Sequence, residues 1–202
     1  MNYTPEQISQ IVLKVLKEVE TPDVSKLSYG EKIKLAKDPN TSQETLAILA
    51  TDEYSSVRYC VAQNQNTSQE TLAILATDKE PGVRYWVARN QNTPQELLRI
   101  LATDEDSYVR YWVARNQNTS QETLKLLATD DDWYVRIGVA RNQNTSKELL
   151  RILATDEDSD VRYWVAQNSN YKKQTLELTS VQYDALKKLI ESGQDEVLKG
   201  IL

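Results

Sequence analysis

The sequence has no histidine and no phenylalanine, and it has only one cysteine, Cys60, and one methionine. Without histidine and with a single cysteine, the usual pairs of nucleophile and general base are missing, and so are the ligands of soft metal sites. No disulfide can form within the chain, which fits a reducing cytoplasm. We therefore expect no catalytic site, no metal and no cofactor, and a cytoplasmic location.

Long apolar runs and an excess of positive charge are missing as well. No segment approaches the roughly 18 apolar residues of a membrane span. The first 20 residues carry charges within an amphipathic pattern, unlike a signal peptide. The net charge of −6 argues against indiscriminate binding to nucleic acid or anionic membranes, because such binding needs a positive field. We expect no membrane contact.

What the sequence does contain is an internal repeat of 26 residues. An asparagine opens each unit, and the units are 40–65, 66–91, 92–117, 118–143 and 144–169. We predict an N-terminal helical cap with a degenerate half-repeat (1–39, the half-repeat at Lys32–Pro39), five repeats (40–169), and a partial repeat with a C-terminal helical cap (170–202). Amphipathic helices are expected from Thr4 to Thr21 and within Ser180–Leu202.

Each unit is predicted to contain two helices. The first begins with a capping box such as Thr67–Glu70, in which the threonine is the N-cap and the glutamate reaches back to it. In the third unit Pro94 would fall at the first helical position, N1. Leu72 and Leu75 lie on one buried face, and we expect Ile74 to widen that face as the helix touches neighbours on both sides.

The second helix is predicted to be short, about eight residues, so part of it is allowed to be 3₁₀. Pro81 suits its N1 position, Val83 and Val87 form its inner face, and Asn90 is expected to end it in a left-handed C-cap. Acidic groups recur where this helix starts, and a calcium loop would need a turn glycine that is missing. We interpret three aspartates as N-caps: Asp106, Asp132 and Asp158.

The repeat resembles that of a known family. The segment VRYWVARNQNTPQELLRILATDED (83–106) is similar to the variant leucine-rich repeat, with its pattern VRxxVAxNxNTPxxLLxxLAxD. The resemblance implies an all-α, right-handed superhelical solenoid of two-helix repeats, in a cytoplasmic bacterial protein that binds other macromolecules. HEAT repeats are the nearest alternative. The chain lacks the cysteine-rich cluster-binding segment of some relatives, and the proline of the family's NPN turn occurs only as Pro39.

The arginine after valine in every unit points toward the core on a helical wheel. We expect a structural ladder in which each arginine pairs with the aspartate of the Thr-Asp step or with carbonyls at helix ends. The recurrent asparagines are interpreted as caps and hydrogen bonds between units. The ladder consists of Arg58, Arg84, Arg110, Arg136 and Arg162 with Asp52, Asp78, Asp104, Asp130 and Asp156.

Some positions of the second helix vary between units, which the scaffold does not require. Position 24 of the unit is arginine only in the three central units and glutamine at Gln63 and Gln167. Because tyrosine and arginine are favoured anchors at interfaces, we predict a partner-binding stripe exposed on this helix. It consists of Tyr85, Arg89, Tyr108, Tyr111, Arg115, Tyr134 and Arg141, with Trp86 and Trp112 at its border. The alternative is packing between units, with the arginines offsetting 19 acidic residues of the repeats.

These observations favour a monomeric, non-enzymatic scaffold for a protein or peptide of acidic or aromatic character. A nucleic-acid reader that stacks bases on the same stripe is the alternative from another class, although the repeats carry 13 basic and 19 acidic residues. Residues 40–52 and 66–78 are identical, so recent duplication and consensus engineering both remain open, and with them a module without a natural ligand.

Overall fold

The computed structural model describes residues 22–171, and the helices expected from Thr4 to Thr21 and within Ser180–Leu202 lie outside that range. Within it the chain is helical throughout, without a strand. A 3₁₀ turn, η1 (Val24–Lys26), and the helix α2 (Tyr29–Lys37) precede the first complete unit. No helix of this range is long and apolar enough to cross a membrane.

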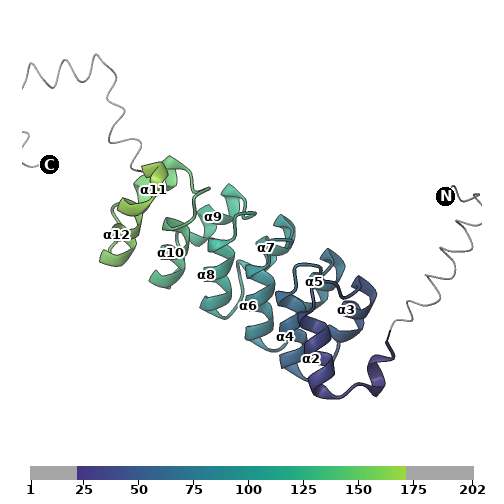
Figure 1. Cartoon of the computed structure of the whole chain (residues 1–202). Coiled ribbons are helices and arrows are strands. Elements are labelled where there is room, and N and C mark those ends of the chain that lie inside the picture. Colours follow the sequence, from purple (N-terminus) through teal and green to yellow (C-terminus); the bar gives the residue numbers. More distant parts are fainter. Residues whose placement is uncertain (1–21, 172–202) are drawn as a thin grey trace, which may run out of the picture.

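Two rows of helices alternate along the array (Figure 1). The first helices of the units are α3 (Gln43–Leu49), α5 (Gln69–Leu75), α7 (Gln95–Leu101), α9 (Gln121–Leu127) and α11 (Lys147–Leu153). The second helices are α4 (Ser55–Gln63), α6 (Pro81–Arg89), α8 (Ser107–Arg115), α10 (Trp133–Ala140) and α12 (Ser159–Gln167). The helix α2 takes the place of a second helix in front of the first unit. The chain is thus an all-helical repeat solenoid.

The second helices are α-helical and longer than the first, so the allowance for 3₁₀ geometry was wrong. They pack directly on one another along the array, which gives them tertiary support that a short isolated helix lacks. Their valines and the leucines of the first helices form one continuous core, in which Leu72 and Val87 are fully buried. The predicted N-caps at Asp106, Asp132 and Asp158 and the proline at N1 of α6 are present.

The first helices are more open. A hollow of about 410 Å³ lies between α9 and α11, lined partly by Leu149 and Ile152. One residue per unit faces out beside such gaps, and Ile74 is 52% exposed, contrary to the expectation that it is buried. The helix is covered on one side only, because its neighbours in the same row stand apart. The same exposure holds for Ile48, Ile100, Leu126 and Ile152.

The cap of the first helix lies one residue later than predicted. Ser68, not Thr67, is the N-cap of α5 and accepts a hydrogen bond from the Thr71 amide. Thr67 is buried, and its hydroxyl donates at 2.6 Å to the Val61 carbonyl near the end of α4, which also accepts from the Asn64 amide. For the same reason Pro94 is the N-cap of α7 rather than N1.

A ladder of buried asparagines joins consecutive units. The Asn90 side chain donates to the carbonyls of Ala62 and Asn64 in the preceding unit, at 2.9 and 3.1 Å. Its own backbone is extended (φ −66°, ψ 131°), so the predicted left-handed C-cap was wrong. The left-handed conformation is not needed, because the turn after Asn90 is closed by the Thr93 amide, which donates to the Asn90 carbonyl at 3.2 Å. Equivalent pairs of hydrogen bonds are made by Asn64, Asn116, Asn142 and Asn168.

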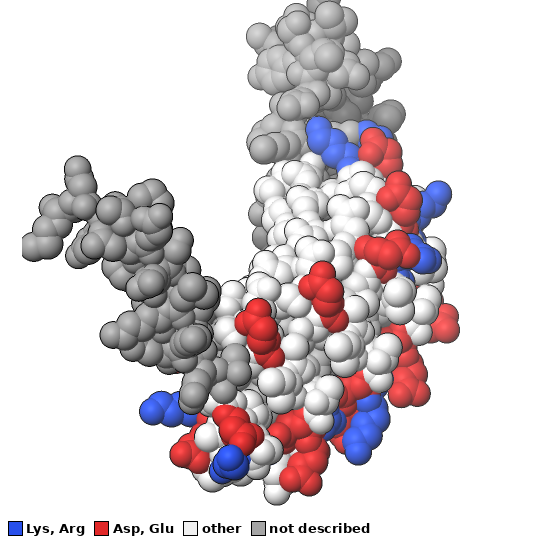
Figure 2. Space-filling model, turned by 90° about the vertical axis from the view of Figure 1, so that its right-hand side faces the viewer, with Lys and Arg blue, Asp and Glu red and all other residues white. Residues whose placement is uncertain are grey.

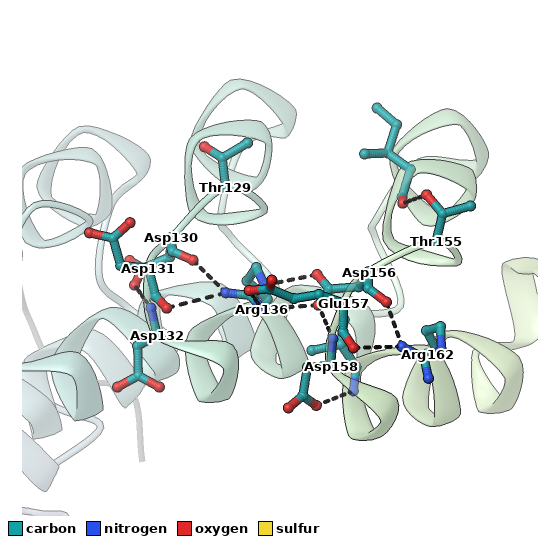
Figure 3. Close-up of polar contacts among 12 residues, drawn as sticks. Thr129, Asp130, Asp131, Asp132, Arg136, Thr155, Asp156, Glu157, Asp158 and Arg162 are labelled. Atoms are coloured by element: carbon teal, nitrogen blue, oxygen red, sulfur yellow. Dashed lines mark hydrogen bonds and ion pairs between the residues drawn. The ribbon is translucent and has the colours of Figure 1, made fainter.

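On the opposite edge the arginines form a second ladder. Arg136 donates through Nε and Nη2 to both carboxylate oxygens of Asp156 in the next unit, at 2.8 and 3.0 Å, and through Nη1 to the Asp130 carbonyl of its own unit (Figure 3). The aspartate is therefore supplied by the following unit, while the carbonyl comes from the same unit. The same pattern joins Arg58 to Asp78, Arg84 to Asp104 and Arg110 to Asp130.

The two ends of this ladder differ from its middle. Asp52 pairs with Lys32 of α2 at 2.7 Å, so a lysine stands where the other units have arginine. Arg162 donates to the carbonyls of Asp156 and Glu157, and the position 20 residues further on, where its carboxylate would be expected, lies outside the described residues. These contacts hold the second helices in register and position the face described below.

Removal of a ladder arginine should strongly destabilise the array. Arg110→Ala leaves the mostly buried Asp130 carboxylate without its cation, at an expected cost of about 3 kcal/mol in the free energy of unfolding. Arg99→Ala is the matched control, because Arg99 also pairs with a carboxylate, Glu96, but on the exposed surface of α7. Thermal melts should show a large shift for the first variant and almost none for the second. Equal shifts would contradict a structural role for the ladder.

The ladder should also make stability depend on pH. Burial alone would raise the pKa of the Asp130 carboxyl, but the Arg110 guanidinium and the Asp132 amide together hold that pKa below its usual range. A lowered folded-state pKa stabilises the fold above the unfolded-state pKa of about 3.9, and this contribution is lost as the pH falls through the lower folded value. Melting temperatures measured from about pH 6 to about pH 2 should fall less steeply for Asp130→Asn than for the parent. Parallel curves would contradict this assignment.

Candidate functional site on the second helices

The residues predicted as an exposed stripe lie together on the second helices, but most of them are not exposed. Of the nine, Arg89 and Tyr108 are exposed and Tyr111 is buried, with 4% of its surface accessible. The helical-wheel placement on an exposed face was therefore wrong for Tyr111, and also for Tyr85, Arg115, Tyr134 and Arg141. A wheel describes one helix, and these side chains are covered by the helices of neighbouring units. Half-buried positions are held by Tyr85, Trp86, Trp112, Arg115, Tyr134 and Arg141.

Aromatic rings connect the units along this face. Tyr59 meets Trp86 edge to face with ring centroids 5.3 Å apart, and Tyr85 meets Trp112 in the same way at 5.7 Å. The tyrosine of one unit therefore packs on the tryptophan of the next, a geometry that aromatic pairs prefer. The inter-unit packing considered above is thus present in units one to three.

Arg89 is held within this aromatic row. Its guanidinium carbon lies 4.6 Å from the centroid of the Trp86 ring and 4.5 Å from that of Trp112, so it is stacked between two indoles. Its Nη1 also donates to the Tyr85 hydroxyl at 3.2 Å. This exposed cation therefore already contacts aromatic side chains of its own and the next unit.

The fourth unit departs from the pattern. Gly138 stands where the second, third and fifth units have tryptophan, and a Cβ there would lie 2.8 Å from Ala114 Cβ and 2.9 Å from the Tyr111 carbonyl oxygen. The glycine allows α10 to pack closely on α8. In place of the missing indole, Tyr134 stacks on Tyr111 with ring centroids 4.1 Å apart.

This departure changes the surroundings of the next two arginines. Arg115 donates through Nη1 to the Arg141 carbonyl at 2.7 Å, while its Nε is buried without a hydrogen-bond partner. Arg141 lies over the Trp164 ring, 4.1 Å from its centroid, and makes only a long contact of 3.4 Å to the Tyr111 hydroxyl. Burial, followed by the nearby charge of Arg141, lowers the pKa of Arg115.

A hollow of about 220 Å³ opens beside these two arginines, at the C-terminal ends of α8, α10 and α12. Both cations line it, together with the Trp164 ring and three amide side chains, Gln143, Gln167 and Asn168. The predicted set omitted Trp164 and Gln143, although the change from tryptophan to Gly138 in the preceding unit is a sequence signal that this region differs. Within residues 22–171 no group of three or more His, Cys, Asp or Glu side chains is placed to hold a metal ion.

A second hollow, of about 430 Å³, lies at the other end of the array. Cys60 replaces the tryptophan of other units there, and Pro81 and Gly82 begin the next helix with small side chains. Burial raises the pKa of the Cys60 thiol, which disfavours the reactive thiolate. We therefore interpret this hollow as a packing difference left by a smaller residue.

Gly138 should be essential for the geometry of the central face. Gly138→Ala places a methyl group against backbone and must push α8 and α10 apart, with an expected loss of about 1–3 kcal/mol in the free energy of unfolding. Gly82→Ala is the control, because no atom lies within 4 Å of its added Cβ, and it should be neutral or slightly stabilising. Chemical denaturation of both variants checks this. An unchanged midpoint for Gly138→Ala would contradict the close approach.

Comparison with known proteins links the repeat to a described family. Residues 81–106, which span the second helix of one unit and the first helix of the next, match the family described as leucine rich repeat variant. A solved structure described as a leucine-rich repeat variant with a novel repetitive structural motif is 26% identical, with 72% of this chain and 68% of that chain covered and a TM-score of 0.36. No curated protein matches the sequence.

Proposed function

We propose that this chain, whose tandem units are leucine-rich repeat variants, is a non-enzymatic scaffold that binds a protein or peptide through its second-helix face. The proposal includes a monomeric state and, as the family resemblance implies, a bacterial cytoplasm. It departs from the expected stripe in one respect. The partner would contact the exposed aromatics and the arginines of the fourth-unit region, while Tyr111 supports them from beneath.

The distribution of exposed large side chains carries this proposal. An outward-facing isoleucine or leucine occupies the same position on every first helix, as a feature of the scaffold would. Exposed aromatics instead belong to the second-helix row, where they vary from unit to unit, and Tyr108 is 62% exposed. Tyrosine and tryptophan offer large, rigid contact areas and are favoured anchors at interfaces. The exposed aromatics are Tyr29, Tyr54, Tyr108, Trp133 and Tyr163.

Charge favours a protein partner over nucleic acid. The repeats carry 13 basic and 19 acidic residues, and four ladder arginines are already neutralised by aspartates. One face of the array shows acidic and basic side chains interspersed rather than a continuous basic surface (Figure 2). A polynucleotide needs such a surface to release its counterions, whereas a peptide with a few acidic groups needs only local cations.

The test uses a peptide selected from an unbiased display library on the full chain. Replacing Arg89, Arg115 and Arg141 together by glutamine, the residue found at Gln63 and Gln167, should weaken its binding by about tenfold or more. Circular dichroism should stay unchanged, because glutamine already occupies this position in two units. Affinity measured by calorimetry checks the effect.

A matched control removes three cations from the other row. Arg99, Lys125 and Arg151 occupy one shared position on consecutive first helices and are exposed. Their replacement by glutamine should leave binding of the selected peptide unchanged. Greater loss in this variant would move the site to the first helices. Selection of no peptide, together with salt-sensitive binding of a single-stranded oligonucleotide, would replace the proposal by nucleic-acid recognition.

A further inference from the structure

We propose that the hollow between Arg115, Arg141 and Trp164 is a carboxylate-binding pocket, which receives an acidic group of the partner. This inference rests on the proposed function and names the chemistry of one part of that surface. The two guanidinium groups would hold the carboxylate, and the Trp164 ring and the amides of Gln143 and Asn168 would form its walls.

Arg115 and Arg141 differ from the ladder arginines in their counter-charges. Every arginine from Arg58 to Arg136 in the ladder holds an aspartate through two hydrogen bonds. Within residues 22–171, neither Arg115 nor Arg141 contacts a carboxylate. Two half-buried cations close enough to repel one another have an electrostatic cost that a bound anion would remove.

The N–H groups of Arg115 also suit a carboxylate. A guanidinium presents five N–H groups in a planar fork that matches the two oxygens of a carboxylate. Arg115 uses Nη1 on the Arg141 carbonyl, which suits a cation near a helix C-terminus, but its buried Nε has no partner. A buried donor without a partner is costly. Arg89, at the same position of an earlier unit, is instead stacked between two indoles.

The volume of the hollow suits a single functional group. The hollow measures about 220 Å³, below the roughly 300–1,000 Å³ of pockets that take a whole small molecule. It suits one functional group presented by a larger partner. An acidic side chain and a C-terminal carboxylate share this chemistry. A phosphate carries more charge and is less favoured beside an array whose repeats are acidic.

The experiment follows the Arg Nε–Hε resonances of the full ¹⁵N-labelled chain, assigned with single glutamine variants, during titration at constant ionic strength. Four probes are compared: acetyl-Ala-Ala-Glu-Ala-amide, its glutamine analogue, the glutamine analogue with a free C-terminal carboxylate, and inorganic phosphate. The first and third probes distinguish the side-chain from the C-terminal source. The second controls for contacts that need no charge.

A saturable shift of the Arg115 resonance is expected with a carboxylate probe and none with the neutral analogue. The Arg115→Gln/Arg141→Gln variant, followed through the indole N–H resonance of Trp164 in the same hollow, should bind that probe about tenfold more weakly or worse, since hydrogen bonds to a charged group are lost. Arg99→Gln, which removes an exposed cation from the first-helix row, is the control and should bind it within about twofold of the parent. Circular dichroism of each variant verifies that it is folded.

The pocket assignment is overturned if no carboxylate probe gives a saturable shift, if only phosphate does, or if the double variant binds as tightly as the parent. Those failures leave the proposed function standing whenever the display-selected peptide still binds and still depends on the second-helix face. Conversely, carboxylate binding without any selectable peptide would support the pocket and reject the scaffold. The two conclusions are therefore separable.

Discussion

The array depends on the hydrogen bonds made by the side chain of the asparagine at the end of each second helix. A helix leaves its last carbonyls unpaired, and when such an end is buried the missing hydrogen bonds must come from elsewhere. Here one buried amide, such as that of Asn142, donates to the carbonyls of Ala114 and Asn116 in the preceding unit. The hydrogen-bonding need of one unit is thus met only when the next unit is in register, which fixes how the helices stack.

The proposed binding face follows from a departure within this fixed register. Because the ladders keep every unit in place, replacing one tryptophan by Gly138 does not disorder the array but brings two helices together. Tyr134 then stacks on Tyr111, and Arg115 is drawn into a half-buried position beside Arg141. Unpaired cations can be accommodated here because the two ladders, which do not involve them, hold the surrounding units in register.

The sequence predicted the features that recur in every unit, and it missed those that depend on contacts with neighbouring units. Leucine and valine spacing identified the buried faces of both helices, since periodicity reports directly on burial. The N-cap was displaced because Thr67 and Ser68 are both good capping residues, and only the position of the preceding helix decides which one is buried. Tyr111 was expected outside because its cover, Tyr134 and Gly138, comes from the following unit. A helical wheel contains no such information.

The fixed spacing of the ladder contacts also bears on how such a gene can change. Arginine and aspartate are joined 20 residues apart in the first four units, and the asparagine at the end of each second helix reaches back 26 and 28 residues in all five. Unequal crossing-over between near-identical repeats, such as 40–52 and 66–78, would therefore add or remove whole units while every contact is re-formed. The unit with Gly138 is not interchangeable in this way, because its loss would set Arg115 against a unit with Trp164 and Gln167. Selection on the site would accordingly retain that one unit in descendants whose repeat number drifts.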